Sequence, residues 1–237
     1  MAFASVRFPD DVKLVQTWPS GSTGDSSADQ VPTEVHYTTS VDGKRVWGYE
    51  VEAAARESGT PGLKWFKLLL QRQADPSTPF AAPPGRILRE WPGGVAPGLL
   101  SHRTTSNSGP SAVAALHSAL TPVDATAERL RQINVQPVAV VTDFLERVRT
   151  VTVASIERTY GTEWVAKDDM MYVLTVPAIW SDSAKSLMVE AARQAGFGCH
   201  RRDFNLVSEP ESAAAYTLKV LQAAYLKVCT TYHQQRG

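Results

Sequence analysis

The pattern of apolar and polar positions predicts two successive strand-to-helix units in the second half of the chain. Residues 170–176 are almost continuously apolar, as expected of a strand buried on both faces of a sheet. Pro177 ends this strand, and Ser181 or Asp182 can cap the helix that follows. Gly196 is the expected carboxyl-terminal stop of that helix. Its buried face, taken from the helical spacing, comprises Ala184, Leu187, Met188, Ala191, Ala192 and Ala195.

A second unit repeats this order. Residues 203–207 predict a strand, and Pro210 suits the first turn of the next helix. Residues 212–226 predict an alanine-rich helix with apolar residues most of the way round, so we expect it to be largely buried. Strands that alternate with helices favour an α/β fold, here a mixed sheet with flanking helices.

The first part of the chain predicts short strands. Residues 12–18 predict one strand, and the polar residues 20–30 that follow predict a loop. Residues 33–38 and 44–49 predict the two strands of a hairpin, because the Asp42-Gly43 pair between them is a strong turn signal.

Helices are predicted on both sides of a region rich in proline and glycine. Residues 50–57 predict a short helix, and residues 63–72 predict a compact apolar helix or turn that contains Lys67. Residues 73–110 carry many prolines and glycines, which indicates a long, poorly ordered insertion. Further helices are predicted over 111–120, over 121–134 with Pro122 in the first turn, and over 137–161.

Composition and charge narrow the class of protein. Apolar residues make up 43% of the chain and charged residues 20%, which is typical of a globular protein. The net formal charge is zero, so we expect no general attraction to nucleic acid or to an anionic membrane. No run of about 18 apolar residues predicts a membrane span. Cys199 and Cys229 are too few for a disulfide framework, which favours a reducing cytoplasm.

Glu209 is the best-placed candidate for chemistry. It follows the second predicted strand, and ligands of open α/β sheets bind beyond the carboxyl ends of strands. A carboxylate there can orient a water, hold a metal through water or act as a base. The alternative is that Glu209 only caps the helix, because acids are favoured at a helix amino terminus. The five histidines are dispersed and predict no metal site.

Two segments resemble the seventy-kilodalton heat-shock chaperone (Hsp70) family, which belongs to the actin-like ATPases. The first, starting at Val173, is VLTVPAIWSDSAKSLMVEAARQAGF, and it resembles the family's V-P-A-Y-F-x-D-x-Q-R strand and helix. The second, starting at Asn205, is NLVSEPESAAAYTL, and it resembles the family's I-x-N-E-P-T-A-A-A-x-A-Y segment. The motifs VPTEVHY, WGYE and LKWFKLLL also look like divergent fungal-type members of this family.

The resemblance implies an incomplete actin-like (ribonuclease H-like) ATPase fold, truncated to roughly its first lobe. Residues 1–72 would supply the amino-terminal strands, residues 73–110 an insertion, and residues 111–237 the helices and the strand-helix core of that lobe. ATP and Mg²⁺ are the implied cofactors.

The resemblance also implies roles for two residues. Glu209 matches the glutamate of the family's N-E-P segment, near the metal and the attacking water, with Ser208 in place of the asparagine. Lys67 matches the family's catalytic lysine. From the residues alone, Lys67 is equally well explained as a solvated amine whose stem covers the core.

The family's two phosphate-binding hairpins do not occur in this sequence. There is no D-x-G-T-T motif, and KVCTTYHQQRG stands where the family has D-x-G-G-G-T. Phosphoryl transfer depends on such loops and on the metal, so we expect impaired ATP binding and hydrolysis. The loss of strands is also expected to expose the edges of the sheet.

Three interpretations follow. The chain is an Hsp70-like ATPase-domain fragment that no longer hydrolyses ATP well. Alternatively, it is a working ATP-binding chaperone component, either completed by a partner chain or belonging to a full-length ATPase. The third possibility is a non-enzymatic interaction module that binds a protein partner through an exposed sheet edge.

Overall fold

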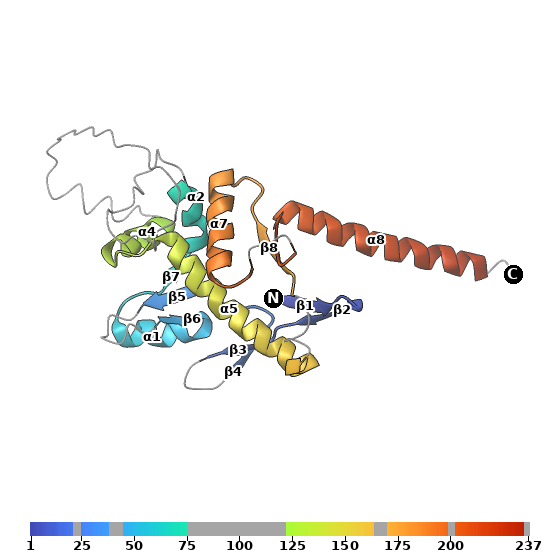
Figure 1. The fold of residues 1–237 in the computed structure, drawn as a ribbon, viewed down its shortest axis with the longest axis horizontal. Helices are drawn as coiled ribbons and strands as arrows, with labels where there is room; N and C mark the ends of the chain where they lie inside the picture. Colours follow the sequence, from blue (N-terminus) through green and yellow to red (C-terminus); the bar gives the residue numbers. More distant parts are fainter. Residues whose placement is uncertain (21–24, 38–44, 75–121, 164–169, 199–201, 235–237) are drawn as a thin grey trace.

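The computed structural model describes residues 1–20, 25–37, 45–74, 122–163, 170–198 and 202–234, with the side chains of the last helix described as far as Gln222. Within these ranges, short sheets lie beside longer helices in a mixed α/β arrangement (Figure 1). The α/β class expected from the sequence is therefore present.

Two antiparallel hairpins open the chain. They are formed by β1 (Ala2–Ser5) with β2 (Phe8–Leu14), and by β3 (Thr17–Pro19) with β4 (Asp25–Ser27). The prediction of one strand over residues 12–18 is wrong, because the chain divides between β2 and β3. The prediction of a loop throughout residues 20–30 is also wrong. The indole of fully buried Trp18 donates to the carbonyl of Ala28 at 2.8 Å, and this bond ties β4 to β3.

The hairpin predicted from residues 33–38 and 44–49 is present as two paired strands. β5 (Glu34–Tyr37) pairs antiparallel with β6 (Arg45–Trp47), and β7 (Leu63–Lys64) pairs with the other edge of β5. The predicted Asp42-Gly43 turn lies outside the described residues. A single turn, η2 (Gly48–Glu50), leads into α1 (Val51–Ser58), which ends at Gly59 in the left-handed conformation with φ of 67°. This helix agrees with the prediction for residues 50–57.

Residues 63–72 are divided among three elements instead of forming one helix or turn. The chain passes from β7 to η3 (Phe66–Leu68) and then to α2 (Leu69–Ala74). The break falls at Trp65, a non-glycine residue with φ of +61°. Below this segment, Phe66, Leu69 and Leu70 are almost completely buried, so burial holds the irregular backbone in place.

Two helices follow residues 75–121, which lie outside the described part of the chain. They are α4 (Pro122–Gln132) and α5 (Pro137–Tyr160), and Gly161 follows the second as predicted. α4 ends two residues before the predicted boundary, and Asn134 then takes a positive φ of 54°. The predicted helix over residues 111–120 and most of the predicted insertion, from residue 75 on, lie outside the described residues.

The strand-helix-strand unit is confirmed. β8 (Tyr172–Val176) and β9 (Phe204–Ser208) pair in parallel, with α7 (Asp182–Gln194) between them in the sequence. Ser181 caps α7, since its hydroxyl accepts a hydrogen bond from the Ala184 amide at 3.2 Å. The predicted apolar face of α7 packs against α5, although Leu187 is only half-buried.

Two predictions of burial are wrong. In β8 the side chains alternate, and Val173 is 52% exposed, because α5 and α7 cover only one face of this pair of strands. The alanine-rich helix α8 (Glu209–Gln234) is exposed along residues 209–222 instead of buried. Figure 1 shows α8 extending away from the other elements, so its apolar side chains find no layer to pack on.

One core joins described residues from before position 75 and after position 121. Four aromatic rings form a chain of edge-to-face contacts through it, with centroid separations of 6.2 Å for Trp18–Trp47, 5.8 Å for Trp47–Phe144 and 5.7 Å for Phe144–Phe66. Each such pair adds about 0.5–1.5 kcal/mol beyond the burial of its area. The core therefore fixes η3, which carries Lys67, relative to α5 and to the β8–β9 pair.

Candidate functional site

Lys67 is positioned by its neighbours in η3. Phe66, the preceding residue, is 1% exposed and anchors the turn in the core, whereas Trp65 is 53% exposed. The Lys67 side chain is one-third exposed and extends to the carboxyl end of β8. There its ammonium donates to the carbonyl of Thr175 at 3.3 Å.

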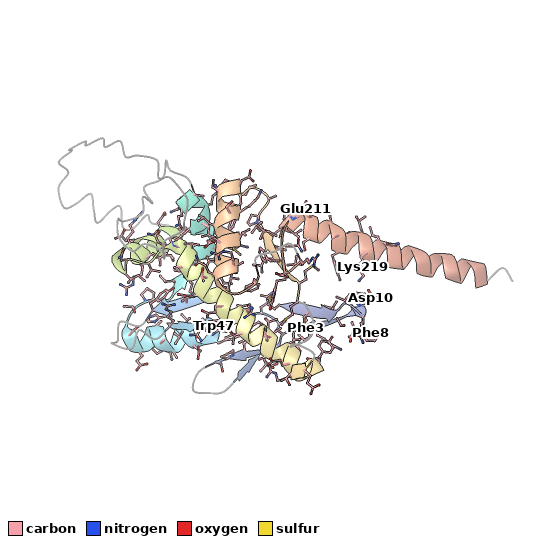
Figure 2. All side chains as sticks on the ribbon, viewed as in Figure 1. Phe3, Phe8, Asp10, Trp47, Glu211 and Lys219 are labelled. Atoms are coloured by element: carbon pink, nitrogen blue, oxygen red, sulfur yellow. The ribbon has the colours of Figure 1, made fainter. Side chains whose placement is uncertain are left out.

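Glu209 is positioned by a capping box at the start of α8. The hydroxyl of Ser208 accepts from the Glu211 amide at 3.3 Å, and the Glu211 carboxylate accepts from the Ser208 amide at 2.9 Å. The bonds from the Ser208 hydroxyl and then from its amide lower the pKa of Glu211. Figure 2 shows Glu211 at the amino-terminal end of this helix. Ser208 and Glu211 thus make the capping hydrogen bonds, while Glu209 also lies in the first turn of α8, where an acid is favoured.

The structure brings the two predicted site residues together. The Nζ of Lys67 lies 3.5 Å from an Oε of Glu209. Lys67 lies beside the end of β8, and Glu209 follows β9 directly, so the pair stands beyond the carboxyl ends of both parallel strands. This is where ligands bind in open α/β sheets.

A buried tryptophan, which no sequence pattern indicated, completes this group. Trp180 is 5% exposed, and the Lys67 ammonium lies 5.6 Å from the centre of its ring. The turn that holds Trp180 is closed by a bond from its amide to the Pro177 carbonyl at 3.3 Å. The carboxamide of Gln71 accepts from the Ser181 amide at 3.0 Å, which joins α2 to this turn.

In this conformation the Lys67–Glu209 pair has little capacity to bind a further charged group. The Lys67 ammonium is already engaged by the Glu209 carboxylate, the Thr175 carbonyl and the Trp180 ring. Glu209 is about half exposed, so water screens its charge strongly. A bound ATP–Mg²⁺ needs cations and amides that face the phosphates. The described residues place one ammonium here, already engaged by its own protein partners, so they fit that cofactor poorly and no step of hydrolysis is assigned to them.

A second polar cluster lies between β5, β6 and α5. Asp143 accepts from the Tyr37 hydroxyl at 2.6 Å and from Arg45 at 2.5 Å. Burial, followed by the nearby Asp143 charge and its hydrogen bond, raises the pKa of Tyr37 far above its usual range. A small hollow beside this cluster is lined by Val35, Arg45, Val46, Trp47, Asp143, Glu146 and Arg147.

His36 is the histidine with a described environment. It is 2% exposed, and its Nε2 lies 3.0 Å from the hydroxyls of both Ser58 and Thr60. Throughout the described part of the chain, no group of three or more histidine, cysteine or acidic side chains could hold a metal ion. In the same residues, no helix combines the length and the apolar character needed to cross a membrane.

The described residues thus define a mixed α/β protein with a lysine–glutamate pair at the ends of two parallel strands. Over 54 residues the chain is 44% identical to heat shock 70 kDa protein 12A of the mouse, Mus musculus. That stretch is 22% of this chain and 8% of the mouse protein, so the similarity is partial. No family model matches the chain. No solved structure matches it either.

Proposed function

We propose that this chain is an Hsp70-like protein of the actin-like ATPase fold, and that Lys67 and Glu209 mark its nucleotide site in a form that binds ATP weakly and hydrolyses it poorly. The observation that carries the proposal is the 3.5 Å contact between these two side chains beyond the ends of β8 and β9. The partial similarity to the mouse heat-shock protein supports the family.

We expect weak binding of ATP because Lys67 and Glu209 already contact each other. A phosphate must displace the Glu209 carboxylate from Lys67 before it can be bound there, and both side chains remain in contact with water. Charges stabilise a transition state well only where the site is preorganised and excludes water. The chain would then act, in a reducing cytoplasm, through weak nucleotide binding more than through turnover.

A nucleotide titration tests this proposal. The indole signal of Trp180, assigned with a Trp180→Phe variant, is followed by nuclear magnetic resonance as ATP and Mg²⁺ are added, and phosphate release is measured in parallel. We expect a weak, saturable shift that Lys67→Ala abolishes. Lys64→Ala is the matched control, because Lys64 pairs with Glu34 at 2.8 Å on the neighbouring strand.

Two results would contradict the proposal in different ways. If the Trp180 signal does not move at any ATP concentration, the Lys67–Glu209 pair is not a nucleotide site. If ATP binds with micromolar affinity and is turned over, and Glu209→Gln stops the turnover, the site is competent and the proposed impairment is wrong.

A non-enzymatic role in binding a protein is the second candidate, and the exposed face of β8 favours it. Met171 and Val173 are 62% and 52% exposed, although a parallel sheet is normally covered on both faces. A partner that packs on this face of the sheet would cover both side chains. We expect Val173→Lys to abolish capture of such a partner without unfolding the chain. Equal capture by both forms would count against this role.

A further inference from the structure

Trp65 has a backbone conformation that few residues other than glycine adopt. Its φ is +61°, in the left-handed region, and among the described residues Asn134 is the only other non-glycine residue with a positive φ. Asparagine is common in this region, whereas a bulky side chain there is an outlier. Strain of this kind persists only where the surrounding structure enforces it, and it collects at sites that bind ligands. The conformation therefore marks Trp65 as a candidate ligand contact.

Packing in the core does not account for a tryptophan at this position. The side chain is 53% exposed, whereas the following residue, Phe66, is 1% exposed. Within the described part of the chain, the indole makes no aromatic ring contact and no hydrogen bond. The buried side chains of Phe66, Leu69 and Leu70 hold the backbone that carries it. An aromatic surface on a backbone fixed in this way loses little conformational freedom when a ligand binds.

Trp65 lies beside the proposed nucleotide site. It directly precedes η3, whose Lys67 ammonium lies 3.5 Å from an oxygen of Glu209 and 5.6 Å from the centre of the Trp180 ring. The Cα atoms of Trp65 and Lys67 are at most about 7 Å apart, because they are two positions apart in the chain. A ligand of nucleotide size that touches the Lys67 ammonium is therefore within reach of the indole.

We propose that the indole of Trp65 stacks on the base of the nucleotide, and that the site selects its ligand by the base more than by the phosphates. This inference rests on the proposed function. The phosphates meet one ammonium, which Glu209 and the Thr175 carbonyl already engage, so they add little affinity. Stacking on an aromatic side chain needs no free charge. The ligand class is therefore a nucleoside, with or without phosphates.

The same physics sets the specificity of such a site. Every base has an aromatic face, so stacking alone discriminates weakly among bases. We therefore expect adenosine and ATP to bind with similar affinity, and inorganic triphosphate to bind more weakly than either. A site that recognised mainly the phosphates would show the reverse order.

A titration of the full chain with three ligands tests the proposal. The indole signal of Trp65, assigned with a Trp65→Phe variant, is followed by nuclear magnetic resonance as adenosine, ATP or inorganic triphosphate is added. We expect adenosine to shift this signal in a saturable way, with a dissociation constant within about tenfold of that for ATP. Inorganic triphosphate is expected to leave the signal unchanged.

Replacement of the indole gives the second measurement. Trp65→Leu keeps an apolar side chain with a Cβ, so the backbone cost stays the same while the aromatic face is lost. In this variant, binding is followed through the aromatic protons of adenosine, and the dissociation constant is expected to rise at least roughly fivefold. Trp65→Phe keeps a ring and should retain most of the affinity. Phe8→Leu is the matched control, because Phe8 is an exposed aromatic residue of β2 (Figure 2).

The outcomes separate this inference from the proposed function. Unchanged adenosine binding in Trp65→Leu, ATP binding more than tenfold tighter than adenosine, or triphosphate binding as tightly as adenosine would each overturn recognition of the base. An ATP-dependent shift of the Trp180 signal would still leave the proposed site standing. If neither Trp180 nor Trp65 responds to any of the three ligands, both proposals fail. Capture of a protein through Trp65 by a chain that does not bind adenosine would also overturn the inference.

Discussion

The Nζ of Lys67 and a carboxylate oxygen of Glu209 lie 3.5 Å apart, although Lys67 belongs to η3 and Glu209 to the start of α8. The contact is possible because the core that contains Phe66 fixes the turn, while the capping box of Ser208 and Glu211 fixes the helix. Two residues distant in the sequence thus meet at the ends of β8 and β9.

The Lys67–Glu209 ion pair should contribute little to stability. The two side chains are 33% and 52% exposed, and ion pairs in contact with water are worth about 0–1 kcal/mol. We expect Glu209→Gln to lower the free energy of unfolding, measured with urea, by less than about 1 kcal/mol. Glu52→Gln, which removes the exposed pair with Arg56, serves as the control. A loss of several kcal/mol in Glu209→Gln alone would mean that the pair has a structural role.

The backbone at Trp65 is strained, and glycine should relieve it. A non-glycine residue at φ of +61° costs on the order of 1–3 kcal/mol. Trp65→Gly and Trp65→Ala both remove the exposed indole, but only glycine adopts this conformation without a steric cost. We expect Trp65→Gly to unfold with a free energy about 1 kcal/mol higher than that of Trp65→Ala. Equal stability of the two variants, measured with urea, would show that the backbone rearranges.

The start of α8 should depend on pH through Glu211. Its pKa is lowered from the ordinary value of 4.5, so its contribution to stability is present above that value and is lost as pH falls through the lower, folded pKa. We expect far-UV circular dichroism to show fraying of α8 in this acidic range. In Ser208→Ala the fraying should already be present at neutral pH. Glu211→Gln keeps the side-chain length and should reduce the acid sensitivity; if acid fraying is unchanged in it, another group is responsible.

Local sequence patterns predicted the helices and strands of this fold better than they predicted which of their faces are buried. The hairpin of β5 and β6, the cap at Ser181 and the stop at Gly196 depend on neighbouring residues, so the sequence was sufficient to predict them. The burial of a side chain depends instead on which other elements cover that face of the strand or helix. The apolar residues of β8 and α8 indicated burial. In the described chain, however, only one face of β8 is covered, and the side chains of α8 are exposed along residues 209–222.

In the candidate site, too, the sequence indicated single residues but not the contacts between them. The sequence placed Glu209 after a strand, and the resemblance to a family singled out Lys67, yet their contact depends on the packing of η3, which no local pattern contains. Trp180 was missed because a single tryptophan in a turn carries no signal for its partner. The capping box could have been found, since Ser208 and Glu211 have the Ser-x-x-Glu spacing that defines it.

The Tyr37–Asp143 hydrogen bond should determine the stability of the chain at alkaline pH. Burial and the Asp143 charge raise the Tyr37 pKa above its ordinary value of 10.0, so the neutral phenol stabilises the fold below that value. This contribution is lost as pH rises from about 10 toward the higher, folded pKa, because the unfolded chain ionises first.

Replacement of the Tyr37 hydroxyl tests this pH dependence directly. We expect Tyr37→Phe to lower the free energy of unfolding at neutral pH by about 1–3 kcal/mol, because partly buried Asp143 loses a partner. We also expect a weaker loss of stability between neutral and alkaline pH than in the wild type, since the ionisable group is gone. Tyr49→Phe is the matched control, because the Tyr49 hydroxyl donates to the exposed carbonyl of Gln30 at 2.8 Å. If Tyr49→Phe changes the alkaline profile as much as Tyr37→Phe, the buried bond to Asp143 is not the cause.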